Sequence, residues 1–240
     1  MKWVTDKTGR FAKRPHYLPE ELDAECEQAI LSFLRKKYGK VEFPIATDDL
    51  TVFIEERAAL DAYADLSGEG TDVQGVTEFV SGKRPIVKIS NQLNAAHLEN
   101  RLRTTLTHEY GHVLFHHFMF EGMESLSPSL FSEKSKDQSN KCNRDSILNA
   151  PERDWMEWQA GYACGAILMP AAALVDAVQR FREERHLTFS NLALNSDSGQ
   201  QLIDIVASSF QTSKDAARVR LLKKGMLIDM GHHHNSNLFQ

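Results

Sequence analysis

The sequence predicts an α+β fold that is mostly helical, in which a small sheet packs against one long helix and a helical hairpin lies at the C-terminal end. Two observations predict this class. Apolar residues recur at helical spacing over several long stretches of the 240-residue chain. Two short β-rich runs near the middle are joined by a glycine-containing turn, which predicts a hairpin of strands.

The composition is that of an ordinary globular protein. Hydrophobic residues make up 42% of the chain and charged residues 25%. A chain of this length can bury a sizeable core, so it needs neither disulfides nor a metal to fold. The formal net charge of -5 argues against a protein that mainly coats nucleic acid.

The cysteines and the N-terminal residues indicate the cellular compartment in which we expect the protein. Cys26, Cys142 and Cys164 are widely spaced and form no C-x-x-C pair, which indicates neither a disulfide framework nor a cysteine zinc site. This usage fits a reducing compartment. The first residues have no apolar segment behind their charges, and no apolar run approaches the roughly 18 residues of a spanning helix. We therefore expect a cytoplasmic protein without a membrane segment.

Residues 1–45 are predicted to form an N-terminal region made of an arm and a helix. The arm, over 1–17, is basic and aromatic and has no clear period. The helix begins with Leu18 and Pro19, because proline is tolerated in a first helical turn, and Gly39 marks its end.

Residues 46–185 are predicted to form the core. Its expected elements are a helix over 47–65, strands over 76–80 and 85–89, and helices over 96–119, 155–169 and 170–185. Pro170 separates the last two helices, since it ends one and can begin the next. Residues 121–151 are polar and lack a period, so we expect a lid or a mobile insertion there.

Residues 186–230 are predicted to form a helical hairpin, followed by a disordered tail over 231–240. Ser198 and Gln201 resemble a capping box for the first helix, and Ser213 caps the second. The second helix is rich in basic residues. The pair is therefore compatible with a DNA-binding helix-turn-helix or with a packing hairpin whose basic face is solvated.

One motif carries the chemistry: residues 108–112 read His-Glu-Tyr-Gly-His within a predicted helix. Positions i and i+4 lie on one helix face, so His108 and His112 can reach the same ion. Neutral imidazole suits zinc, and Glu109 between the histidines can contact water at the metal. The sequence thus predicts two zinc ligands and a catalytic base. The alternative is a pair of core or surface histidines beside an exposed glutamate.

Catalytic zinc usually has three protein ligands, and Glu157 is the candidate for the third. The positions three, four and seven residues after it are Ala160, Gly161 and Cys164. This small face lets the two helices approach closely enough for a short carboxylate to reach the metal. The alternative is that Glu157 caps its own helix. The fallback ligands are Glu121, Glu124, Glu152 and Asp154.

Two further histidines follow the motif. His116 lies four residues past His112, but an unbroken helix turns it away from the ion, so we expect it to support a ligand or to pack. His117 is expected at the surface. The stabiliser of a developing oxyanion is not fixed by the sequence, and Tyr162 and His186 are candidates.

Two segments resemble the ImmA/IrrE family of metallo-endopeptidases. Residues 102–107, the motif at 108–112 and Val113-Leu114-Phe115-His116 resemble that family's zinc helix. Residues 160–170 resemble its second signature, which carries the third-ligand glutamate three residues before its alanine, here Glu157.

The resemblance covers roughly residues 45–225, with three departures. The family often has Asn or Asp where Gly161 stands and a second acid where Gln159 stands, and the stretch 121–151 is longer than usual. The resemblance implies a gluzincin-like core and a zinc-dependent endopeptidase. It further implies a protein substrate, such as a helix-turn-helix repressor of a mobile element or a stress response.

Two rival functions remain open from the sequence. One is a regulator that binds DNA or a partner protein through the helical hairpin over 186–230. The other is a regulatory protein with an inactive or structural metal site, although a structural zinc is closed by four protein ligands and the sequence offers no convincing fourth. The sequence makes no prediction of the oligomeric state.

Overall fold

The computed structural model describes residues 1–70, 72–80, 82–121, 138–143, 150–151, 154–187 and 192–229, with only the backbone described over 138–143. It is an α+β structure and 58% helical, which confirms the predicted fold class. The predicted tail over 231–240 lies outside the described residues, as does most of the predicted insertion over 121–151.

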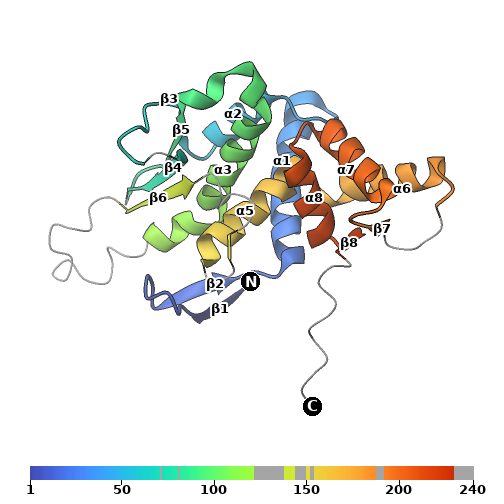
Figure 1. Cartoon of the computed structure of the whole chain (residues 1–240). Helices are drawn as coiled ribbons and strands as arrows, with labels where there is room; N and C mark the ends of the chain where they lie inside the picture. Colours follow the sequence, from blue (N-terminus) through green and yellow to red (C-terminus); the bar gives the residue numbers. More distant parts are fainter. Residues whose placement is uncertain are drawn as a thin grey trace, which may run out of the picture.

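Seven α-helices occur among the described residues. They are α1 (Pro19–Tyr38), α2 (Thr47–Glu55), α3 (Glu99–Glu121), α5 (Trp155–Leu168), α6 (Ala171–Glu184), α7 (Asp197–Phe210) and α8 (Lys214–Lys223). Two short 3-10 turns, η1 (Asn91–Asn94) and η2 (Ala96–Leu98), precede α3. Helices α3 and α5 pack together in the middle of the molecule, between the sheet on one side and the hairpin of α7 and α8 on the other (Figure 1).

The strands in the described part of the chain form three small sheets. They are β1 (Lys2–Thr5), β2 (Lys13–His16), β3 (Ala59–Ala64), β4 (Val73–Phe79), β5 (Ile86–Ser90), β6 (Gln138–Asn143), β7 (Leu192–Ala193) and β8 (Leu227–Ile228). The largest sheet has the order β3-β5-β4-β6, in which β4 and β5 are antiparallel and β3 runs parallel to β5. The predicted strand hairpin is therefore confirmed.

The predicted helix over 47–65 is wrong in its second half. Helix α2 ends at Glu55, and Ala59–Ala64 forms β3. The backbone N–H of Ala59 donates to the carbonyl of Pro85, and β3 then pairs with β5. An alanine-containing segment of helical propensity thus becomes a strand because a sheet edge supplies hydrogen-bond partners from far along the chain.

The N-terminal arm predicted over 1–17 is instead a hairpin of β1 and β2. Its aromatic residues hold it against the protein: Trp3 lies edge-on to Phe118. The predicted Ser198 capping box is also wrong. Ser196 caps α7, and its hydroxyl accepts a hydrogen bond from the N–H of Gly199 at 3.1 Å. The Ser213 cap of α8 is confirmed.

One large hydrophobic core contains residues from α1 to α8 and β8. Helix α5 is buried along nearly its whole length because it lies against α1, α3 and α8. Among the described residues no single helix is long and apolar enough to cross a membrane, and the bent pair of α5 and α6 passes such a test by length and composition only.

Candidate metal centre

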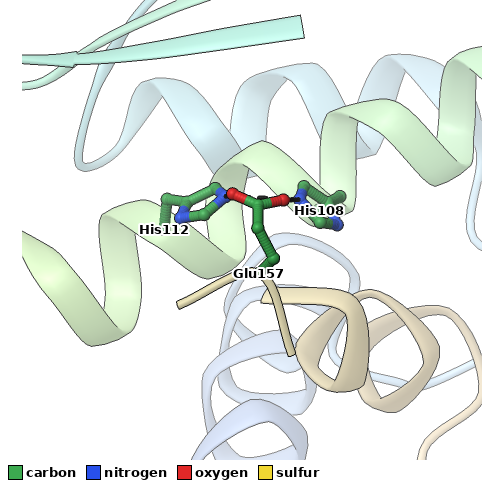
Figure 2. Close-up of side chains that lie close together, drawn as sticks. All are labelled: His108, His112 and Glu157. Atoms are coloured by element: carbon green, nitrogen blue, oxygen red, sulfur yellow. Dashed lines mark hydrogen bonds and ion pairs between the residues drawn. The ribbon is translucent and has the colours of Figure 1, made fainter. Parts of the chain in front are cut away.

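Two helices bring three potential metal ligands together. His108 and His112 lie on one face of α3, and Glu157 reaches them from the first turn of α5 (Figure 2). The histidines are fully buried and Glu157 is 9% exposed. The carboxylate points between the two imidazoles, so it is not a cap of its own helix.

The distances between the ligand atoms are nearly equal. Nε2 of His108 lies 3.2 Å from Nε2 of His112 and 3.2 Å from Oε2 of Glu157, and Nε2 of His112 lies 3.2 Å from Oε1 of Glu157. Ligand atoms about 2.0–2.1 Å from a tetrahedral metal lie about 3.3 Å from one another. The two imidazole nitrogens are therefore spaced like ligands of one tetrahedral ion, and the Glu157 carboxylate presents one oxygen to each of them.

Glu157 and the histidines shift one another's pKa. Burial alone would raise the pKa of Glu157, but His112 and His108 outweigh it and hold that pKa well below its usual range. Burial would lower the pKa of His112, but the Glu157 carboxylate raises it on balance. A proton can be shared across only one of these contacts, whereas one metal ion could be held by all three residues.

The close approach of α3 and α5 depends on Gly111. A Cβ atom at this position would lie 2.9 Å from Cα of Ala160 and 3.0 Å from Cβ of Ala163. Backbone atoms cannot rotate away, so any larger residue would force the helices apart. The small face that the sequence shows at Ala160 is thus one half of the contact, and Gly111 within the motif is the other.

Glu109 lies beside the three ligands but is held by the sheet. Thr77 on β4 donates from its hydroxyl to Oε2 of Glu109, and Oε1 has no hydrogen-bond partner among the described residues. Glu109 is fully buried, and burial raises the pKa of its carboxyl group. A buried carboxylate with one free oxygen and a raised pKa is suited to accept a proton.

Sequence reasoning missed two residues that position Glu109. Thr77 is fully buried, and Gly75 on the same strand lies so close that a Cβ there would be 2.4 Å from Oε1 of Glu109. The alternation of the β4 strand places both residues on the face toward α3. Only the glycine gave a signal, since glycine inside a strand often marks a close approach.

The neighbouring histidines differ in their surroundings. His116 is fully buried, and its two ring nitrogens face His112 and Gln159. His117 is half-buried rather than fully at the surface: it stacks on Phe79 at 6.1 Å and faces Glu121 at 3.7 Å.

The other described residues that the sequence suggested as oxyanion stabilisers or fallback ligands are not part of the metal group. Tyr162 donates its hydroxyl to Asp23, and His186 lines a separate pocket beside α6, so neither is joined to the metal group. Asp154 is the N-cap residue of α5. The fallback ligands Glu124 and Glu152 lie outside the described residues.

The basic residues of α8 and its C-cap contact other groups of this chain. Lys214 pairs with Asp204, Arg218 with Asp215, and Lys223 lies over the Tyr162 ring, while Arg220 and Lys224 pair with Asp23. These contacts are those of a hairpin that packs on the core.

No protein-family model matches the sequence, and no curated protein matches it at a significant level.

Proposed function

We propose that this protein is a zinc-dependent endopeptidase whose metal is bound by His108, His112 and Glu157. One observation carries the proposal: two buried imidazole nitrogens lie 3.2 Å apart, each of them lies 3.2 Å from one oxygen of the Glu157 carboxylate, and a buried glutamate with a free oxygen lies next to them. A group of buried polar residues that only stabilised the core would need neither converging ligand atoms nor a free carboxylate oxygen.

The donor set fits zinc. Two imidazole nitrogens and one carboxylate oxygen form a common catalytic zinc site, in which three protein ligands leave a position open. Both cysteines among the residues with described side chains are buried in the core and are not in the ligand group. Zinc bound here supplies a Lewis acid that polarises a peptide carbonyl and makes water more acidic.

Glu109 supplies the proton transfer in this proposal. Its free Oε1 takes a proton from the attacking water, and the same oxygen then gives that proton to the leaving amine. The Thr77 hydroxyl fixes the other oxygen, so the carboxylate keeps one orientation through both steps. Its raised pKa matches this role, because a carboxylate that is too acidic would not hold the proton.

The substrate class comes from the motif resemblance. We propose a cytoplasmic protein that cuts a regulator, such as a helix-turn-helix repressor, at a limited number of sites. Binding to nucleic acid is not part of the proposal, because the basic residues of the C-terminal hairpin already contact acidic or aromatic groups of the chain.

The test is a comparison of wild type with Glu109→Gln. Both proteins should bind about one zinc per chain, and the variant should lose cleavage by roughly 10²-fold or more, since it keeps the ligands and lacks the base. Candidate regulators and unfolded casein are incubated with each protein, and fragments are mapped by mass spectrometry. Equal cleavage by the two proteins would contradict the mechanism, and broad digestion of casein without preference would contradict the substrate class.

A further inference from the structure

A row of buried polar groups lies behind His112, on the side away from its ligand atom. Nδ1 of His112 is 3.0 Å from Nδ1 of His116, and Nε2 of His116 is 3.1 Å from Oε1 of Gln159. The side-chain amide of Gln159 donates to the carbonyl of Pro15 at 3.1 Å. The row thus begins on β2, passes through α5 and ends at a ligand on α3.

Because this row is buried, a polar group in it that lost its hydrogen bond would stay without a partner. His116 is fully buried and Gln159 is 1% exposed, so water is not available to replace a missing partner. Within the row, each ring nitrogen of His116 and each polar side-chain atom of Gln159 has one hydrogen-bond partner.

The Pro15 carbonyl fixes the direction of every hydrogen bond in the row. A carbonyl oxygen only accepts, so the Gln159 amide presents its NH₂ group to Pro15 and its oxygen to His116. That oxygen also only accepts, so His116 carries its proton on Nε2. A neutral His116 then accepts at Nδ1, and His112 must donate from its own Nδ1. The lone pair of His112 is left on Nε2, toward His108 and Glu157.

We propose that His116 and Gln159 are positioning residues that, anchored on the Pro15 carbonyl, hold His112 in the Nδ1–H tautomer and present its Nε2 to the metal. This inference rests on the proposed zinc site and adds the N-terminal hairpin to it. Outer hydrogen-bond partners of a ligating histidine orient the ring and typically contribute 10–100-fold to metal affinity.

Aromatic packing holds the hairpin that carries the anchor. Phe11, in the turn between β1 and β2, lies edge-on to Phe120 at 5.5 Å and to Trp155 at 6.2 Å. Trp155 in turn lies edge-on to the His116 ring at 5.3 Å. The same aromatic group therefore fixes the hairpin and the imidazole that depends on it.

The first test reads the tautomers in the metal-free protein by nitrogen NMR at alkaline pH, where no bound metal imposes them. In wild type the proton of His116 should be on Nε2 and that of His112 on Nδ1, with a scalar coupling between the two Nδ1 nitrogens across their hydrogen bond. In Gln159→Leu both rings should exchange between tautomers, because the fixed end of the row is gone. A proton on Nδ1 of His116 in wild type would overturn the proposal.

The second test measures zinc affinity by competition with a chelator. Gln159→Leu should bind zinc about 10–100-fold more weakly than wild type. Gln159→Glu keeps an acceptor for His116 but loses the donor to the Pro15 carbonyl, so it should recover only part of this loss. Tyr162→Phe is the matched control, since it removes a buried hydrogen bond from the same helix to Asp23, and it should keep wild-type affinity. An equal loss in Gln159→Leu and Tyr162→Phe would mean that Gln159 acts only through stability, which contradicts the proposal.

The two tests separate this inference from the proposed function. If zinc binds and substrate is cleaved while the tautomers are reversed, the row of hydrogen bonds is misassigned and the peptidase stands. If the tautomers and the Gln159 series follow expectation while Glu109→Gln retains full cleavage, the positioning role stands and the mechanism falls.

Discussion

The molecule contains two buried polar clusters that use charge in opposite ways. In the first, Asp23 on α1 lies 2.7 Å from Arg220 and 2.8 Å from Lys224, and it accepts a hydrogen bond from Tyr162. In the second, two imidazole nitrogens and the Glu157 carboxylate converge at 3.2 Å. In the Asp23 cluster the carboxylate is neutralised by basic side chains of the same chain. The second cluster contains three potential metal ligands and no basic side chain of Lys or Arg among its members.

This difference separates a structural cluster from a binding site. A buried carboxylate is stable when basic side chains neutralise it, as Arg220 does across the contact of α1 and α8. Three converging donors are stable when a cation from outside occupies the space between them. Asp23 therefore joins the C-terminal hairpin to the core, and the histidine group could hold an ion.

Among the changes that test this comparison, Asp23→Ala is expected to have the largest effect, which is on the free energy of unfolding. The change leaves Arg220 buried and unpaired, and it should lower the free energy of unfolding by about 3–5 kcal/mol. Chelation of zinc should destabilise wild type and this variant by the same amount, because the clusters do not share residues. Denaturant titrations with and without chelator measure both quantities. A variant that loses its response to chelator would show that the clusters are coupled.

A smaller effect, on catalysis alone, is expected from Gly75→Ala. The added Cβ would lie 2.4 Å from Oε1 of Glu109, so the carboxylate must move. A misplaced catalytic group can cost about 10²-fold in rate, and zinc affinity should stay unchanged because no ligand moves. Gly68→Ala, where nothing lies within 4 Å of the new atom, is the control. Full activity in Gly75→Ala would contradict the assigned position of the base.

The smallest effect is a pH dependence of the Asp23 cluster. Burial would raise the pKa of Asp23, but Arg220 and Lys224 outweigh it, so the pKa in the folded protein is below the unfolded value of about 3.9. The stabilisation is therefore complete above about pH 5 and is lost as the pH falls through the folded pKa. The stability difference between wild type and Asp23→Asn should be constant above that pH and shrink below about pH 4.

An exposed carboxylate provides the control for this pH dependence. Asp204 pairs with Lys214 at the surface, its side chain is 55% exposed, and such pairs contribute at most about 1 kcal/mol. The difference between wild type and Asp204→Asn should thus remain small at every pH. A wild-type advantage over Asp23→Asn that grows toward acid pH would reverse the assigned sign of the pKa shift.

The sequence predicted the parts of the site that follow from spacing within one helix. His108 and His112 share a face because four residues make about one turn, and the small residues after Glu157 indicated a close helix contact that the structure contains. Zinc itself and the peptidase activity remain predictions, since the sequence and the structure supply only the ligand group and its surroundings.

The sequence did not predict the parts that depend on distant segments. Thr77 reaches Glu109 only because β4 crosses α3, and Pro15 reaches Gln159 only because the N-terminal hairpin folds against α5. The segment Ala59–Ala64 has no strong strand pattern of its own and becomes β3 through its pairing with β5. Such contacts leave no local signal, because the partner that decides each of them lies far along the chain.

The most direct test of the central claim is zinc K-edge X-ray absorption on protein loaded with one zinc per chain. The account predicts a first shell of nitrogen and oxygen at about 2.0–2.2 Å, with scattering from two imidazole rings, no sulfur, and the loss of one oxygen ligand in Glu157→Ala. Cys164 is buried in the hydrophobic core outside the ligand group, so its thiol is not expected to bind. Sulfur at about 2.3 Å, or an unchanged shell in Glu157→Ala, would contradict the assignment of His108, His112 and Glu157.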